Sequence, residues 1–219
     1  MKIPMSQDLT GTCNLCGKTF SRVAMTRHLK SCPAVSGHGE QALEQCFLLL
    51  VEARPYWLHL AAPVDAPLSR VDAFLRKIWL ECCGHLSAFT VAGKRYTSSA
   101  RKELGNSGMS APLNRILQQG LIFHYEYDLG STTELKLKVV GLRDQAIKRG
   151  AITLLARNDP PQFTCDECRS QPAVLICTEC LYKDKGLLCA SCADEHECDP
   201  EVRLPVVNSP RTGVCGYAG

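Results

Sequence analysis

The chain has 219 residues, of which 45% are hydrophobic and 21% are charged, and its formal net charge is +3. This composition is typical of a folded globular protein with room for one core and one or two small modules. It contains neither the roughly 18 consecutive apolar residues of a membrane-spanning helix nor, near its start, the apolar run of a signal peptide. We therefore expect a cytoplasmic protein without a membrane segment. The small net charge excludes the strong basic bias of a dedicated nucleic-acid-binding protein.

The cysteines are distributed unevenly along the chain. Of the 14, three lie in residues 1–40, three in residues 41–160 and eight in residues 161–219. A reducing cytoplasm disfavours disulfides, so dense cysteine patterns there indicate metal binding. The two cysteine-rich ends differ in charge, since residues 1–40 hold five basic and two acidic side chains and residues 161–219 hold five and nine. We expect these two ends to have different partners.

The first cysteine-rich stretch, residues 10–34, has the ligand spacing of a zinc finger. Cys13 and Cys16 are followed after eleven residues by His28, and Cys32 follows after three more. A gap of two residues lets both thiolates of a tight turn reach one ion, and a gap of three on a helix places His28 and Cys32 on one face. The stretch resembles the ββα zinc-finger family in a CCHC form. It predicts one Zn²⁺ held by these four residues.

The finger also carries basic side chains that could hold a phosphate backbone: Lys18, Arg22, Arg27 and Lys30. In the usual helix register of a zinc finger, Arg27 is the one base-reading position able to make a strong contact to guanine. One finger reads about three base pairs, which is too few for useful specificity. Weak nucleic-acid binding and a protein-binding or purely structural role therefore both stay open.

After a Pro/Ser/Gly-rich linker at residues 32–40, residues 41–158 are predicted to form an α+β domain with a central mixed sheet and two helices. The predicted elements are, in chain order, strands at 47–53 and 57–62, a helix at 67–83, a hairpin through Gly93, a short helix at 111–120, two strands within 121–141, and a strand at 151–157. Ser69 and Asp72 predict a capping box at the start of the first helix. A second linker is expected at the Pro-Pro pair within residues 157–162.

Residues 47–140 resemble the plasmid open-reading-frame-3-like family, which is also met as a passenger protein of bacterial insertion elements. The matching features are the strand-then-helix start, Trp79 followed by His85, and the turn YEYDLGSTTEL at residues 125–135. The family typically has Tyr-Asp-Phe-Gly in this turn, where the present chain has Leu129 in place of phenylalanine. The resemblance implies a fold and a prokaryotic mobile-element context, and it implies no settled activity.

An enzymatic role for this domain is the alternative hypothesis, either as an enzyme or as an accessory factor in mobile-element DNA processing. Acid–base chemistry would use four polar side chains that the fold would have to bring together: His85, His124, Glu126 and Asp128. A carboxylate on every second residue of a strand is more typical of a solvated face. No phosphate-binding loop, nucleophile elbow or kinase signature occurs. We therefore predict no catalytic residue, and we interpret Cys82 and Cys83, at a helix end, as core.

The last stretch, residues 163–219, holds three Cys-x2-Cys pairs at even spacing, each of them half of a tetrahedral site. The pairs are Cys165 and Cys168, Cys177 and Cys180, and Cys189 and Cys192. Two zinc ions need two further ligands, and His196 and Cys198 are nearest, with Cys215 as a substitute or an extra ligand. We predict an interleaved arrangement, in which the first and third pairs share one Zn²⁺ and the second pair, His196 and Cys198 share the other.

This C-terminal module resembles the B-box type of zinc module, a treble-clef-like arrangement, in the segments CDECRSQPAVLICTEC and LLCASCADEH. It departs from the family in having Cys198 where a further histidine is more common. The resemblance implies a scaffold or protein-interaction role, and the absence of a separate RING gives no support for ligase activity. Redox dithiol chemistry and catalytic zinc fit poorly, because eight or nine ligands indicate closed sites. With few apolar residues, the module is expected to fold only with metal bound.

The sequence thus predicts a non-enzymatic adaptor or regulatory protein of the prokaryotic cytoplasm with about three structural Zn²⁺ ions. A protein partner is expected, nucleic acid is an open alternative, and no small-molecule substrate is identified.

Overall fold

The structure is a computed structural model that describes residues 9–34, 42–99, 107–147, 149–181, 183 and 185–219. Within these residues the chain has an α+β architecture with one large mixed sheet, one small sheet and short helices, so the predicted fold class is confirmed. The linker expected at residues 32–40 falls mostly on residues 35–41, outside the described residues. None of the described helices is long and apolar enough to cross a membrane.

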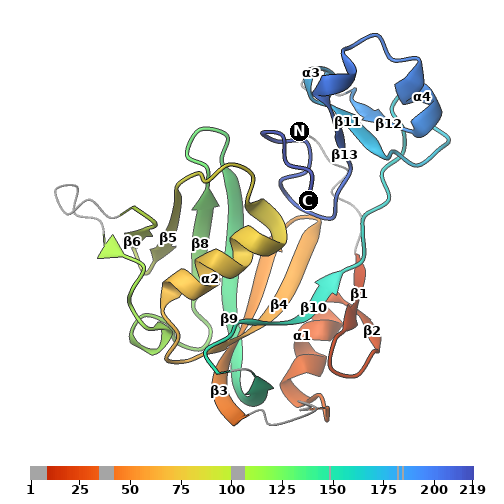
Figure 1. Cartoon of the computed structure of the whole chain (residues 1–219). Helices are drawn as coiled ribbons and strands as arrows, with labels where there is room; N and C mark the ends of the chain where they lie inside the picture. The colour runs from red at the N-terminus through yellow and green to blue at the C-terminus, as the bar shows by residue number, and fades with distance from the viewer. Residues whose placement is uncertain (1–8, 35–41, 100–106, 148, 182, 184) are drawn as a thin grey trace.

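The large sheet contains ten described strands in the order β2-β1-β10-β4-β3-β9-β8-β5-β6-β7 (Figure 1). They are β1 (Thr10–Cys13), β2 (Thr19–Ser21), β3 (Ala42–Ala53), β4 (Tyr56–Pro63), β5 (Ser87–Val91), β6 (Lys94–Thr97), β7 (Ser107–Gly108), β8 (Ile122–Tyr127), β9 (Thr133–Ile147) and β10 (Thr153–Asn158). Neighbouring strands are antiparallel, except that β6 and β7 run parallel. The hairpin predicted through Gly93 is the β5–β6 connection.

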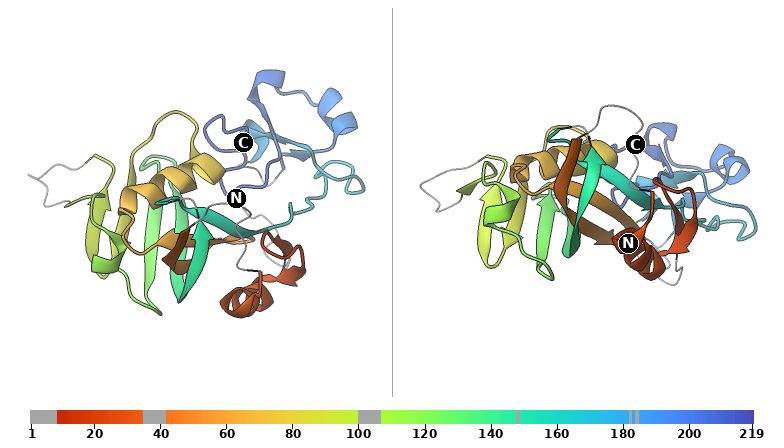
Figure 2. Two further views of the ribbon diagram at one scale, coloured as in Figure 1. Left: turned by 60° about the horizontal axis from the view of Figure 1, so that its bottom comes forward. Right: turned by 90° about the horizontal axis from the view of Figure 1, so that it is seen from below.

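Two helices cover opposite faces of this sheet, α1 (Arg22–Ser31) and α2 (Leu68–Leu75), and a π-helical turn at Arg76–Leu80 continues α2 (Figure 2). Side chains of a strand point alternately to the two faces. Along β3, Leu49 therefore joins the core under α2, whereas Leu48 joins the core under α1. The apolar run of β3 is thus explained by burial on both faces.

The capping box predicted at the start of α2 is wrong, because the helix has no side-chain cap. The carboxylate of Asp72 does not cap the helix, and it accepts hydrogen bonds from Ser87 Oγ at 2.6 Å and Tyr125 OH at 2.8 Å. The backbone N–H of Ser69 donates to the carbonyl of Met109 at 2.9 Å. A distant loop satisfies the first N–H groups of the helix, so the side chain of Asp72 is free to bind the sheet.

The second predicted helix is a single 3₁₀ turn at Leu113–Arg115. Its backbone is tied to the loop before α2, because the N–H of Leu113 donates to the carbonyl of Ala66 and the N–H of Asn114 donates to that of Val64. These tertiary hydrogen bonds bind the N–H groups of the 3₁₀ turn to another part of the chain. The longer helix that the local sequence favours therefore does not form.

The finger is continuous with the large sheet. Its strand β1 pairs with β10, so that Gly11 lies opposite Asn158. A Cβ atom at Gly11 would lie 2.2 Å from the carbonyl oxygen of Arg157 and 2.7 Å from the Trp57 ring. Glycine is therefore required at this close approach of two backbones. The division of the chain into three domains stays a prediction, and the sheet itself runs from the finger through the central residues without a break.

The C-terminal module contains a small sheet in the order β12-β11-β13 and two short helices. Its elements are β11 (Leu175–Cys177), α3 (Thr178–Leu181), β12 (Leu187–Leu188), α4 (Ala190–Asp194), a 3₁₀ turn (Pro200–Val202) and β13 (Arg203–Pro205). The C-terminal segment, residues 206–219, then returns to the large sheet beside the end of α2 (Figure 1). There the hydroxyl of Ser209 donates to the carbonyl of Trp79 at 2.6 Å.

Candidate metal centres

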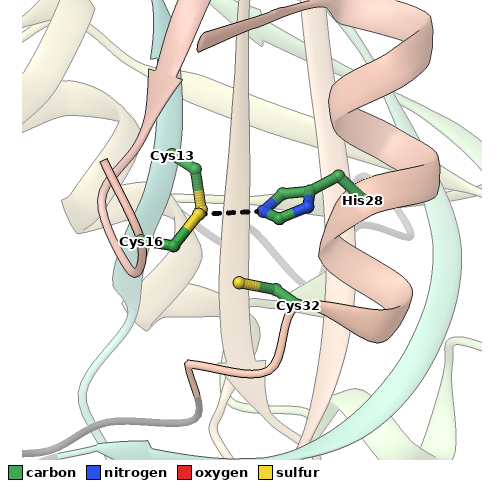
Figure 3. A group of neighbouring side chains, drawn as sticks. All are labelled: Cys13, Cys16, His28 and Cys32. Carbon is green, nitrogen blue, oxygen red and sulfur yellow. Dashed lines mark hydrogen bonds between the residues drawn. The ribbon is translucent and has the colours of Figure 1, made fainter. Parts of the chain in front are cut away.

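The finger cluster consists of the four residues predicted from the spacing, which the structure brings together (Figure 3). Cys13 ends β1, Cys16 lies in the following turn, His28 lies on α1 and Cys32 follows its last residue. The ligand atoms all lie within 4.8 Å of one another, and Cys16 Sγ is 3.2 Å from His28 Nε2. Gly17, at a φ of 72°, donates its N–H to the carbonyl of Cys13 and closes the turn that aims both thiols inward.

The four-cysteine cluster is formed by Cys165, Cys168, Cys189 and Cys192. The first two lie in a turn like that of the finger, in which the N–H of Arg169 donates to the carbonyl of Cys165 and Arg169 has a φ of 53°. Cys189 directly precedes α4 and Cys192 lies within it, with Cys168 and Cys189 sulfurs 3.9 Å apart. The cluster therefore combines a tight turn with a helix start.

Ionisation within the four-cysteine cluster is uneven. Hydrogen bonds from the Ser170 side chain and from the backbone of Ser170 and Gln171 lower the pKa of Cys168 to about 6. The hydrogen bond shared with Cys189, together with burial, raises the pKa of Cys192 to about 12. Four thiolates so close together repel one another, and a bound cation removes this repulsion because coordinated thiols are deprotonated. The arrangement suits a divalent metal.

The His196 cluster contains Cys177, Cys180, His196 and Cys198. Cys177 ends β11 and Cys180 lies in the short helix α3 that follows. Cys180 Sγ lies 3.5 Å from His196 Nε2 and 3.5 Å from Cys198 Sγ. The structure thus groups the eight residues of the C-terminal module in the interleaved order, with Cys198 in the second group.

Arg203 on β13 holds the loop that carries two of these residues, and sequence reasoning did not identify it. Its guanidinium donates to the carbonyls of Ala193 at 2.5 Å and His196 at 2.7 Å, and also to that of Cys198. A rigid fork of donors is suited to fixing several carbonyls at once. Its signal in the sequence is weak, since it is a lone arginine between two apolar residues.

The bridging cluster, formed by Cys82, Cys83, His85 and Cys215, completes the four Cys/His groups found among the described residues. The interpretation of Cys82 and Cys83 as core is wrong for Cys83, which is exposed, while Cys82 is half-buried. Cys215 lies 3.8 Å from Cys83, sulfur to sulfur, and is thus placed away from the His196 cluster. The sequence places Cys82, Cys83 and His85 close together, but the fourth member of the cluster, Cys215, lies about 130 residues further along the chain.

The four polar residues considered for catalysis do not converge on one site. His85 Nδ1 lies 3.5 Å from the buried Asp128, which also pairs with Arg211. Glu126 and His124 lie on the other, more exposed face of β8, where Glu126 pairs with Arg95 at 2.6 Å.

The basic residues of the finger differ in their surroundings. Lys18, Arg27 and Lys30 are exposed, whereas Arg22 is half-buried and forms an ion pair with Glu52. Arg22 is therefore held against the large sheet, and three basic side chains remain at the surface.

Comparisons with known proteins give little further information. No family model matches the chain, and no curated protein matches it significantly. Among solved structures, the chain is similar to the protein of unknown function MM3350 from Methanosarcina mazei Go1, a crystal structure. The two chains are 14% identical with a TM-score of 0.43, and the match covers 52% of this chain and 68% of MM3350. A similarity this weak assigns neither a family nor a function.

Proposed function

We propose that the protein is a zinc-stabilised, non-enzymatic interaction protein that holds structural Zn²⁺ in the finger, four-cysteine and His196 clusters. The observation that carries the proposal is the spacing of the ligand atoms. A tetrahedral Zn²⁺ with Zn–S bonds of about 2.3 Å has sulfur–sulfur edges of about 3.8 Å and slightly shorter sulfur–nitrogen edges. The sulfur–sulfur separations of 3.9 and 3.5 Å and the sulfur–nitrogen separations of 3.2 and 3.5 Å agree with such edges.

A structural role follows from the number of ligands in each cluster. Four protein ligands complete a tetrahedral shell and leave no open position for a substrate, which is the arrangement of structural zinc. Among the described residues of the C-terminal module, the local apolar cluster has three buried members, Cys177, Leu188 and Ala193. So small a core stabilises a fold weakly, and metal binding supplies the remaining free energy.

The finger supports this structural role, because it covers one face of the large sheet. Met25 and Leu29 of α1 are buried against Leu48 and Trp57 in one core cluster. In addition, Arg143 of β9 donates to the carbonyl of Leu29 at 2.7 Å, near the end of α1. The Zn²⁺ of the finger would hold this helix in place, and zinc loss would expose the sheet beneath it.

The C-terminal module carries the feature that favours a protein partner. Five acidic residues are exposed within residues 194–201, and none of them has an ion pair within the described part of the chain: Asp194, Glu195, Glu197, Asp199 and Glu201. An unpaired acidic surface on a rigid support favours a basic partner through electrostatic complementarity. We propose a basic protein surface as the partner, in the prokaryotic mobile-element context that the family resemblance implies.

The experiment that tests this proposal is metal analysis of the purified chain. We expect zinc to be the bound metal, and Cys168→Ser and Cys16→Ser each to lower its content by one ion per chain. Cys46→Ala is the matched control, because Cys46 is buried outside all four clusters. A chain that keeps its fold in a chelator and contains no zinc would contradict the proposal. Charge reversal of Glu195 and Glu197 then tests the acidic surface. We expect the protein to lose its crosslinks to the partner protein in cells while its zinc content stays the same.

A further inference from the structure

Two parts of the chain that are far apart in sequence meet beside the end of α2. Cys82, Cys83 and His85 follow the π-helical turn, and Cys215 comes from the C-terminal segment. All four ligand atoms lie within 4.8 Å of one another. We propose that this bridging cluster is a further Zn²⁺ site, which fastens the C-terminal segment to the large sheet. The site goes beyond the three structural zinc ions of the proposed function.

The sulfur–sulfur distances within the cluster fit one tetrahedral ion. The Cys83 sulfur lies 3.7 Å from that of Cys82 and 3.8 Å from that of Cys215. These separations agree with the edge of about 3.8 Å around Zn²⁺. His85 Nε2 lies 2.9 Å from the Cys83 sulfur and 3.3 Å from the Cys215 sulfur, so the imidazole faces the same point as the thiols.

The chain is bent locally so that Cys83 and His85 face each other. Gly84 between them has a φ of 77°, a conformation that glycine adopts without strain. Its N–H donates to the Glu81 carboxylate at 2.6 Å, and the same carboxylate accepts from Tyr127 OH at 3.0 Å. The turn is therefore held by Glu81, which Tyr127 of β8 holds in turn, without the help of a metal.

His85 has the support that metal-bound histidines usually have. Its Nδ1 lies 3.5 Å from the Asp128 carboxylate, and its ring packs edge-on against Tyr127. A carboxylate at one ring nitrogen fixes the tautomer and leaves the other nitrogen to bind metal. Asp128 thus positions His85, and Nε2 is the atom that faces the three thiols.

Cys215 is brought to the cluster by a segment that is already anchored. Arg211 is fully buried, pairs with Asp128 at 2.7 Å and donates to Thr133 Oγ1 at 3.1 Å. Cys215 itself has a φ of 51°, which is uncommon for a residue other than glycine. Such strain is kept where the surrounding structure over-determines it, and here it places the Cys215 thiol toward His85.

Exposure distinguishes this site from the other three. Among the described residues, each of the other clusters includes at least one buried cysteine, whereas Cys83 and Cys215 are exposed and Cys82 and His85 are half-buried. Water and chelators therefore reach the bridging site most easily. We expect its ion to be the first that a chelator removes, with release of the C-terminal segment as the consequence.

The test is a comparison of zinc content between variants of the full chain. The wild-type protein should hold one zinc ion more than the three of the proposed function, and Cys215→Ser and Cys83→Ser should each lose one ion. Cys46→Ala should lose none. His85→Cys, which keeps four ligands, should restore the ion that His85→Ala loses. A second readout is alkylation of Cys215, which should be slow in the zinc-loaded chain and at least tenfold faster after mild chelation, before the other zinc ions leave.

Two outcomes would overturn this site alone and leave the proposed function standing. One is a wild-type chain with three zinc ions whose content Cys215→Ser leaves unchanged, which would leave the proposed function intact. The other is a disulfide between Cys83 and Cys215 in protein purified under reducing conditions, detected by peptide mass. Circular dichroism identifies a variant that unfolds. In that case the rate of Cys215 alkylation in the wild-type chain, before and after mild chelation, decides whether the site binds zinc. Absence of all zinc would refute both proposals together.

Discussion

Arg211 and Asp128 form a salt bridge of 2.7 Å in which the arginine side chain is wholly buried and the aspartate is nearly so. The guanidinium also lies over the Tyr127 ring, 4.9 Å from its centroid. Because Arg211 belongs to the C-terminal segment and Asp128 follows β8, the pair joins the last residues of the chain to the large sheet. The same aspartate faces His85, so one carboxylate serves both the anchor and the bridging cluster.

We expect Arg211→Ala to lower the free energy of unfolding by about 3–5 kcal/mol, because it removes the guanidinium that balances the charge of the buried Asp128 carboxylate. Arg95→Ala is the matched control. Arg95 and Glu126 form a partly exposed pair, with side chains that are 37% and 32% exposed, and its loss should change stability by less than about 1 kcal/mol. Urea unfolding of the zinc-loaded variants measures both. Equal effects of the two substitutions would show that Arg211 is no anchor.

The packing of the finger on the sheet predicts a difference between two residues of α1. Leu29→Ala removes a side chain that is 1% exposed, and should cost about 3 kcal/mol through lost contacts and the cavity that remains. Val23→Ala changes a side chain that is 50% exposed, and should have an effect within about 0.5 kcal/mol. Thermal unfolding with zinc content monitored separates packing from metal loss. A small effect at Leu29 would mean that the finger does not cover the sheet in solution.

Arg203 should control the metal affinity of the His196 cluster without being a ligand. Arg203→Lys loses the fork that holds the carbonyls of His196 and Cys198, and we expect zinc affinity at this cluster to fall about 10–100-fold. A competition titration with a chromophoric chelator gives the affinities of the separate classes of site. Arg169→Lys, an exposed change next to the four-cysteine cluster, is the control that should leave them unchanged.

Stability should depend on pH through His59, which lies on β4 and faces α1, with its Nε2 2.8 Å from Thr26 Oγ1. Burial, and then the charge of Arg22, lower the pKa of His59 from 6.5 to about 3. Below pH 6.5, His59 becomes protonated in the unfolded chain but stays neutral in the folded chain. The free energy of unfolding therefore decreases as the pH falls from 6.5 toward 3. Between about pH 7.5 and about pH 5.5 this loss is roughly 1.4 kcal/mol.

The variant His59→Gln separates this effect from metal release, which acid promotes in both proteins. Glutamine does not titrate, so its stability should fall by roughly 1.4 kcal/mol less over the same pH range. Unfolding titrations at the two pH values, together with the chemical shifts of the His59 ring, provide the measurement. Parallel losses in the two proteins would show that His59 titrates normally.

Nucleic-acid contact through the finger remains a second candidate, and three exposed basic residues limit its strength. Three phosphate contacts from Lys18, Arg27 and Lys30 would make duplex binding fall roughly 40-fold between about 50 and 200 mM salt. Arg27→Ala combined with Lys30→Ala should leave one contact and a decrease of only about 3.5-fold over that range. Fluorescence anisotropy with random duplex DNA and RNA measures both slopes. Absence of binding at low salt would leave the finger as a cover of the sheet alone.

Local patterns in the sequence were enough to predict part of the candidate metal centres and most strands. The pairs Cys13 and Cys16 or Cys165 and Cys168 lie within one tight turn, so their spacing alone brings two sulfurs together. Alternation and apolar runs likewise predicted β4, β5 and β8, because the period of a strand is a local property. The predicted α+β class followed from these runs.

Only the tertiary structure decided which distant residues meet. Cys215 contacts Cys83 although the two are 132 positions apart, and β1 of the finger pairs with β10, more than 140 positions away. Neither contact can be predicted from the spacing of neighbouring residues. Asp72 was expected to cap α2, but it binds Ser87 and Tyr125 because a distant loop already satisfies the first N–H groups of the helix. The sequence thus determines ligand pairs and strand periods, whose geometry is set within a few residues. Packing and strand register, which depend on the whole chain, determine how those parts are joined.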